Sequence, residues 1–139
     1  MGAGRHTPWR LLATSAARGW DIEEEAIRAT GGEAEFVATA CATEAELIAA
    51  ASEADAIYAG NEPYTRQILE QLRRVKVISR PAVGFDQIDI AAAAELGIVV
   101  THVPDYCTDE VSDHALALLL ALHRRVPWLN AAIMAGQWA

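Results

Sequence analysis

The sequence is poor in cysteine and in positive charge, and it has no long hydrophobic run. Its two cysteines, Cys41 and Cys107, belong to no CxxC pair and no Cys/His cluster of zinc spacing, so we expect two reduced thiols and no metal site. With 11 basic and 19 acidic residues, the formal net charge of −8 argues against binding to nucleic acid or an anionic membrane. The longest apolar run, residues 115–122, is far too short to cross a bilayer, and residues 1–12 lack the apolar segment of a signal peptide. These absences favour a cytoplasmic protein.

The chain also lacks the common motifs of catalytic sites. It contains no GxGxxG fingerprint, no Walker loop, no HExxH and no GxSxG, and its Gly2-Ala3-Gly4 segment lacks a third glycine. No histidine is assigned near Cys107 by sequence logic, which argues against a nucleophilic role. Asp113 and His114 are neighbours on an expected helix, where adjacent side chains point about 100° apart, so adjacency alone forms no acid–base pair. All four histidines are expected to be surface or packing residues: His6, His102, His114 and His123.

What is present is a regular alternation of short apolar segments and helical segments. At 139 residues, with 53% apolar and 22% charged residues, the chain has the length and composition of one globular domain. Strands are expected at 9–14, 36–39, 56–59, 75–79 and 98–103, and helices at 21–29, 43–51, 64–74 and 89–95. Such alternation is typical of right-handed βαβ units with helices on both faces of a parallel sheet. We therefore predict an α/β fold, a flavodoxin-like three-layer sandwich with five parallel strands.

Local signals mark several helix ends. Asp21 is expected to cap the first helix, and Thr43 has Glu46 three residues later, which is the spacing of a capping box. Asp89 is expected to cap the fourth helix, and Gly97 to end it in a left-handed conformation.

A long helix is expected after the fifth strand, over residues 109–125. Residues 108–110 (Thr-Asp-Glu) offer a cap and two acids for its first turn, and the helix is apolar all round over residues 115–122. A domain this small can hardly enclose such a helix, so a second domain or another subunit is implied. Without one, this helix should leave a large apolar surface.

The loop at residues 80–86 is the first candidate for a binding site. Gly84 would let the backbone approach a ligand, and free N–H groups at Val83 and Gly84 could hold a carboxylate. Arg80 could pair with an anionic substrate through its planar guanidinium. Two other interpretations stay open: the glycine only relieves a tight turn, and Arg80 is a solvated charge or a partner of Asp86.

Two further loops are expected at the same edge of the sheet. Asn61 follows the third strand and could donate a hydrogen bond to a small acid, although Asn and Pro in residues 61–63 are equally suited to turn chemistry. Residues 105–110 follow the fifth strand, and their N–H groups should face the same crevice.

Four stretches resemble one family signature. They are residues 76–80 (Lys-Val-Ile-Ser-Arg), 83–89 (Val-Gly-Phe-Asp-Gln-Ile-Asp), 92–104 (Ala-Ala-Ala-Glu-Leu-Gly-Ile-Val-Val-Thr-His-Val-Pro) and 111–114 (Val-Ser-Asp-His) with the Ala/Leu run that follows. Together with the segments between them they span residues 76–122, about a third of the chain. They are similar to the D-isomer-specific 2-hydroxyacid dehydrogenases, the family that includes phosphoglycerate dehydrogenase, glyoxylate/hydroxypyruvate reductase, formate dehydrogenase and the C-terminal-binding-protein co-repressors.

This resemblance implies a substrate-binding domain at residues 1–108, followed at 109–139 by a crossover helix and the start of an NAD-binding domain. It implies that a small 2-hydroxy or 2-oxo acid is held by the amides of Val83 and Gly84, with Ala82 and Arg80 in the same loop and Asn61 opposite. It also implies that Cys107 and Val111 contact NAD or NADP. This cofactor would be bound mainly by a domain absent from this chain. A full-length homodimer is also implied.

The chain departs from the family pattern in its loop and in its extent. Ala82 replaces the first glycine of the usual Gly-Val-Gly, Pro81 stiffens the loop, and Cys107 stands where many members carry Asn. The family's glycine-rich fingerprint and its catalytic Arg, Glu and His would all lie beyond this sequence. We therefore expect the N-terminal part of an NAD(P)-dependent oxidoreductase, without turnover by itself. A non-catalytic binding module, similar to the co-repressors or sensing a small acid, is the alternative.

Overall fold

The computed structural model describes residues 8–15 and 19–138. In the first part of the chain the elements are β1 (Trp9–Ala13), α1 (Asp21–Arg28), β2 (Ala34–Ala38), α2 (Glu44–Ala51), β3 (Ala56–Tyr58), α3 (Arg66–Leu69), β4 (Val77–Arg80), α4 (Ile90–Glu95) and β5 (Val99–His102). Two helices follow, α5 (Thr108–His123) and α6 (Val126–Met134). The chain divides into two compact units, residues 1–104 and 105–139.

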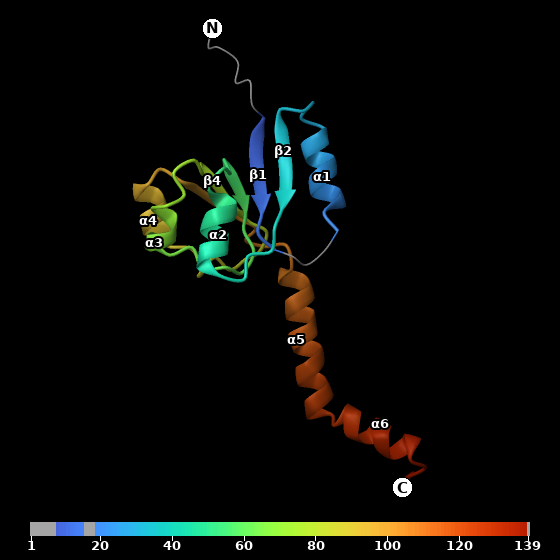
Figure 1. Cartoon of the computed structure of the whole chain (residues 1–139). Coiled ribbons are helices and arrows are strands. Elements are labelled where there is room, and N and C mark those ends of the chain that lie inside the picture. Colours follow the sequence, from blue (N-terminus) through green and yellow to red (C-terminus); the bar gives the residue numbers. More distant parts are fainter. Residues whose placement is uncertain (1–7, 16–18, 139) are drawn as a thin grey trace. The chain divides into compact units, whose positions relative to one another are not determined.

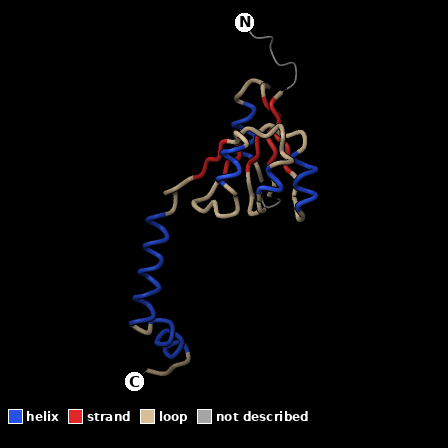
Figure 2. The backbone as a smooth tube through the Cα atoms, turned by 90° about the vertical axis from the view of Figure 1, so that its left-hand side faces the viewer, coloured by secondary structure: helices blue, strands red, loops and turns tan. Residues whose placement is uncertain are grey.

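The first unit is built on a parallel sheet with the strand order β2-β1-β3-β4-β5. The arrows of β1 and β2 point the same way in Figure 1, and Figure 2 shows the strands (red) side by side with helices (blue) around them. This strand order is that of flavodoxin-like proteins. The predicted α/β fold with five parallel strands is confirmed.

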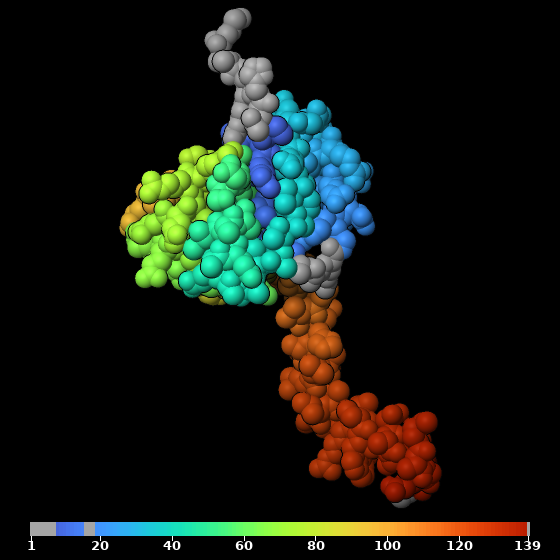
Figure 3. All heavy atoms as spheres, viewed as in Figure 1, coloured from blue at the N-terminus to red at the C-terminus, as the bar shows by residue number. Residues whose placement is uncertain are grey.

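One face of the sheet carries the hydrophobic core. The register aligns Leu12, Ile57 and Ile78 on neighbouring strands, and all three side chains are buried. Helices α2, α3 and α4 pack against these strands. The side chains that they bury in the core are Leu47, Ala51, Ile68, Leu69, Ala92 and Ala93. Parallel strands are short and apolar when helices cover them, and these strands fit that rule. In Figure 3 the blue atoms of β1 lie between the cyan atoms of β2 and the teal atoms of α2.

The opposite face is covered near β2 by α1. Leu11 and Phe36 are register partners on this face, because side chains alternate along a strand and their neighbours Leu12 and Val37 belong to the core. Trp20, directly before α1, contacts Phe36 edge-on, with ring centroids 5.6 Å apart. It contacts Tyr58 of β3 in the same way at 5.7 Å. Helices therefore lie on both faces, as expected for a three-layer sandwich.

Short-range capping signals are mostly confirmed. The Thr43 hydroxyl accepts a hydrogen bond from the Glu46 N–H at 3.2 Å, and the Glu46 carboxylate accepts one from the Thr43 N–H. Asp89 accepts from the Ala92 N–H at 2.8 Å. Gly97 has φ of 72°, a left-handed conformation that glycine adopts without strain. The cap assigned to Asp21 is wrong, because this residue is already the first in α1 and Trp20 holds the cap position without a side-chain bond.

The third helix is shorter than predicted. We expected residues 64–74, whereas α3 contains only Arg66–Leu69. The reason is tertiary: Tyr64 forms an isolated parallel bridge with Ile88, donating its N–H to Gln87 O at 2.7 Å and accepting from the Asp89 N–H at 3.0 Å. Its backbone groups therefore serve a second sheet-like pairing and not a helix.

The second unit consists of α5 and α6. The expected helix over 109–125 ends at His123, because Arg125 adopts a left-handed conformation with φ of 53°. The cap expected at Thr108 is wrong, since Cys107 holds that position without a side-chain bond, but the two expected acids, Asp109 and Glu110, do lie in the first turn. Helix α6, with Pro127 in its first turn, was not foreseen. Among the described helices, none combines the length and apolarity needed to cross a membrane.

Candidate functional site

The loops that follow β1, β3 and β4 meet at one edge of the sheet. Ala13, Tyr58 and Ser79 are register partners close to the carboxyl ends of these three strands. Loop N–H groups converge outside the strand ends of open α/β sheets, which is where such proteins bind ligands. Asn61 and residues 80–84 are therefore brought to the same edge.

A buried threonine fixes the loop after β3. Thr14, fully buried after β1, donates its hydroxyl proton to the Glu62 carboxylate at 2.8 Å and accepts from the Gly60 N–H at 3.0 Å. Because a hydroxyl has one proton, the Tyr64 hydroxyl, 3.2 Å away, is the donor in its contact with Thr14. Burial is the main reason that the pKa of Tyr64 is raised, so its phenol is neutral and can donate. No sequence motif marks this cluster, since Thr14 is far along the chain from its partners.

Arg80 ties the loop after β3 to the loop after β4. Its Nε donates to Gly84 O at 3.1 Å, and its Nη1 donates to the carbonyls of Ala59, at 3.2 Å, and Gly60. Its Nη2 donates to Asn61 Oδ1 at 2.7 Å. Four of the five N–H groups of a guanidinium are thereby used, and one on Nη2 is left for a ligand. Arg80 is thus neither a solvated charge nor a partner of Asp86, the two alternatives that the sequence left open.

Two carbonyl groups of the loop after β4 accept hydrogen bonds from residues at the end of β5. Ala82 O accepts from the Val103 N–H at 3.1 Å, and Val83 O accepts from Nδ1 of His102 at 3.0 Å. In a trans peptide the N–H points opposite to the preceding carbonyl, so the amides of Val83 and Gly84 point away from β5. Within residues 8–15 and 19–138 neither amide donates a hydrogen bond. Both residues are exposed.

Gly84 is not required by the backbone conformation of this loop. Its φ lies outside the left-handed region, unlike that of Gly97. A Cβ built on Gly84 would meet only Asp86 Oδ2, at 3.6 Å, which is an ordinary contact. The interpretation that this glycine relieves a tight turn is therefore wrong. A side chain at this position would therefore be tolerated by the loop itself.

His102 supports this loop, although only a surface or packing role was expected for it. Its Nδ1 must carry a proton, because the Val83 carbonyl can only accept. Its ring also packs edge-on against Phe85, with centroids 5.0 Å apart. The feature of the sequence that could have predicted this role is the position of His102 at the end of the fifth strand, beside the loops that form the site.

A cavity of about 430 Å³ adjoins Arg80 and Asn61. Its other walls include Trp20, Tyr58 and Glu23. The Tyr58 hydroxyl donates to Glu23 Oε1 at 3.1 Å, and the pKa of Tyr58 is raised, first by burial and then by this carboxylate. The cavity thus has an aromatic wall and a polar end where Asn61 and Arg80 lie.

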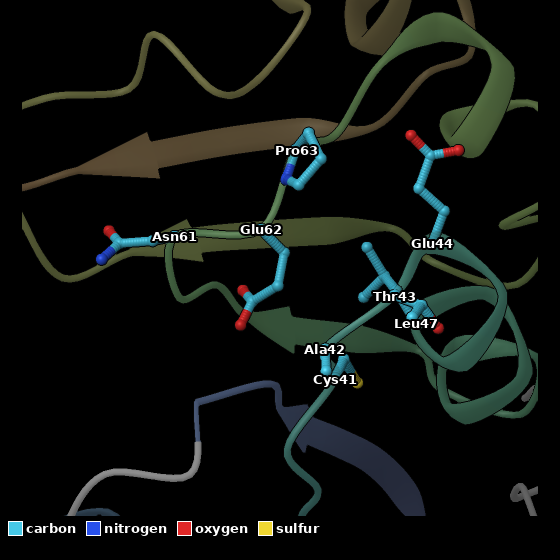
Figure 4. A pocket seen from close by; sticks show the side chains of 8 residues that line it. All are labelled: Cys41, Ala42, Thr43, Glu44, Leu47, Asn61, Glu62 and Pro63. Carbon is cyan, nitrogen blue, oxygen red and sulfur yellow. The ribbon is translucent and has the colours of Figure 1, made fainter.

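A second pocket, of about 370 Å³, lies on the other side of the loop after β3. Figure 4 shows Asn61 and Glu62 extending from this loop in different directions, with Cys41 and Glu44 across the pocket. Two carboxylates in its lining make it a poor site for an anion. They and Cys41 form no metal site, since no group of three or more suitable side chains is found among the residues that the structure describes.

The two residues predicted to contact a nicotinamide cofactor, Cys107 and Val111, lie in the second unit. Cys107 is half-buried and Val111 is 61% exposed. Their thiol and isopropyl side chains can offer van der Waals contact, and only the thiol is a hydrogen-bond donor, a weak one. Their predicted role stays a prediction.

Comparison with known proteins identifies the family. The family model described as D-isomer specific 2-hydroxyacid dehydrogenase, catalytic domain, matches residues 14–135. The chain belongs to this family. Relatives agree: D-3-phosphoglycerate dehydrogenase from Methanocaldococcus jannaschii is 32% identical over 118 residues, which are 84% of this chain and 22% of that protein. Glyoxylate reductase from Thermococcus litoralis is 42% identical over 73 residues, 52% of this chain and 22% of that protein. The chain thus spans about a fifth of the length of these family members.

Solved structures of the family share the fold. D-lactate dehydrogenase from Aquifex aeolicus, solved in complex with NAD and lactic acid, is 25% identical with a TM-score of 0.73, over 94% of this chain and 38% of that chain. A glyoxylate reductase from Paecilomyes thermophila gives a TM-score of 0.77 over 94% of this chain and 43% of that chain. At 23% identity, the second likeness shows the fold alone.

Proposed function

We propose that this chain is the acid-binding part of an NAD(P)-dependent oxidoreductase that interconverts D-2-hydroxy acids and 2-oxo acids. The amides of Val83 and Gly84 would hold the carboxylate of the acid. The observation that carries the proposal is that the Ala82 and Val83 carbonyls accept hydrogen bonds from Val103 and His102, at the end of β5. The following N–H groups, on the exposed residues Val83 and Gly84, therefore point away from β5. Successive amides of this kind form a concave anion site.

The surrounding residues are suited to orient the acid. Arg80 brings a positive charge beside the two amides, and its free N–H on Nη2 lies next to Asn61. The Oδ1 atom of Asn61 accepts a hydrogen bond from Arg80. Its amide nitrogen therefore remains as a donor toward the 2-oxo or 2-hydroxyl oxygen of the acid. Hydrogen bonds to a charged group are worth about 1.5–3 kcal/mol each, enough for a small acid to be held by few contacts.

NAD or NADP would accept or supply the hydride when bound. Cys107 and Val111 are the residues of this chain proposed to contact it. The contribution of the residues described above is to bind and orient the acid, and we propose that the chain by itself shows no hydride transfer.

The test uses Gly84→Ala and observes the amides directly. Titration of the ¹⁵N-labelled chain with sodium glyoxylate or pyruvate should shift the amide resonances of Val83 and Gly84. The new methyl group stands beside the Gly84 amide and meets only Asp86 Oδ2, at an ordinary contact distance. Gly84→Ala should therefore crowd the bound carboxylate and weaken acid binding about tenfold, the equivalent of one hydrogen bond to a charged group, without changing the Tm.

Gly97→Ala is the matched control. It forces alanine into a left-handed conformation and should cost about 1 kcal/mol of stability, while leaving acid affinity unchanged. Acid binding that Gly84→Ala does not alter, or resonance shifts confined to other residues, would contradict the proposal.

A further inference from the structure

We infer that the cavity of about 430 Å³ beside Arg80 receives the side chain of the acid, and that this side chain is uncharged and aromatic. The inference rests on the proposed function, since it needs the carboxylate to lie at the amides of Val83 and Gly84. The named relatives act on different acids, and the cavity would decide which side chain of the acid this chain accepts.

The cavity and the two amides are close enough for one small molecule to reach both. Arg80 and Pro81 line the cavity, and Val83 is only two residues further along the chain. Because consecutive Cα atoms are 3.8 Å apart, the Cα atoms of Pro81 and Val83 can be separated by no more than about 8 Å. The amides also point away from β5, and β3, whose following loop contributes Asn61 to the cavity, neighbours β4 on that side.

The aromatic wall is held in place before any ligand arrives. Trp20 and Tyr58 meet nearly at right angles, with an interplanar angle of 88°, and Trp20 is also packed against Phe36. The hydrogen bond from Tyr58 to Glu23 fixes the second ring. Offset and edge-to-face ring pairs are favourable beyond the area that they bury, so a third ring would gain from both partners.

The described part of the lining suits a phosphorylated side chain poorly. Arg80 is the one cation among the described lining residues, and four of its five N–H groups are already donated to protein acceptors. The carboxylate of Glu23 stands at the same wall. A phosphate needs several free donors and is repelled by a carboxylate, whereas an uncharged ring meets neither difficulty.

The experiment compares three acids by titration calorimetry on the intact chain: glyoxylate, phenylpyruvate and 3-phosphohydroxypyruvate. Phenylpyruvate should bind about tenfold more tightly than glyoxylate, and 3-phosphohydroxypyruvate should bind no better than glyoxylate. Trp20→Ala should remove the preference for phenylpyruvate and leave glyoxylate affinity unchanged. Trp20→Phe should keep most of the preference, because a ring remains.

Trp9→Ala is the matched control, since Trp9 is 51% exposed on β1 and is not among the lining residues of the cavity. It should leave all three affinities unchanged. Glyoxylate binding with shifts at Val83 and Gly84 but without a preference for phenylpyruvate would overturn this inference and leave the proposed function standing. A phosphorylated acid that binds most tightly would also overturn it. Absence of binding by any acid would overturn both.

Discussion

At Cys41, burial and two carboxylates act on the same thiol. Burial is the largest cause of its raised pKa, followed by the charges of Glu62 and Glu46. All three disfavour the negative thiolate. A raised pKa means that less thiolate is present at any pH below it, and the thiolate is the form that reacts with alkylating agents. Cys41 should therefore react with iodoacetamide more slowly than a free thiol at pH about 8.

The measurement uses a Cys107→Ala variant, in which Cys41 is the remaining cysteine. The rate of alkylation against pH should have its midpoint above that of N-acetylcysteine. Glu62→Gln should lower this midpoint, because it removes one negative charge, but only in part, since burial is the larger cause. A midpoint at or below that of N-acetylcysteine would show that the thiol is not held in this environment.

Among single residues, the sequence predicts those whose role is set within a few positions of the chain. Gly84 is such a residue, because a glycine in a loop after a strand lets the backbone approach a ligand. The partners of Arg80 were not foreseen, since its acceptors Ala59, Gly60 and Asn61 are 19 to 21 positions away. They come within reach only because β3 and β4 are neighbours in the sheet.

At the scale of one element, α2 depends on its capping box. Thr43→Ala removes the hydroxyl that accepts from the Glu46 N–H. The loss should lower the free energy of unfolding by about 1 kcal/mol, a typical value for an N-cap. The effect should appear in global unfolding, because α2 supplies the buried side chains of Leu47 and Ala51 to the core. Urea denaturation measures it.

Thr43→Ser is the control, because it keeps the accepting oxygen and should cost only a few tenths of a kcal/mol, roughly the difference between two good capping residues. Equal losses for alanine and serine would mean that the threonine methyl group, and not the capping bond, stabilises the helix.

Helices are predictable where local signals decide them. The capping residues of α2 and α4 are close in sequence to the groups that they bind, so both helices were expected almost as found. The range of α3 was wrong because Tyr64 pairs with Ile88, a contact between segments far apart in the chain. The end of α5 was expected within two residues of its place, but the left-handed conformation of Arg125 was not, because such conformations are uncommon for non-glycine residues.

At the scale of the whole molecule, the second unit presents apolar side chains that nothing in that unit covers. No described side chain of α5 or α6 is buried. Leu119 is 62% exposed, Leu122 is 74% exposed and Trp128 is 64% exposed. Apolar surface costs free energy in water, and contiguous patches of it usually mark an interface. We therefore expect the chain to self-associate in solution as its concentration rises.

Size-exclusion chromatography with light scattering over a range of concentrations measures this association. The double variant Leu119→Glu/Leu122→Glu should shift the chain toward monomer, because two charges cannot be buried without partners. Ser112→Glu/His114→Glu introduces two glutamates on α5 outside the leucine run, so it should leave association unchanged if apolar contact, and not net charge, is the cause. A wild-type chain that stays monomeric at every concentration would contradict the prediction.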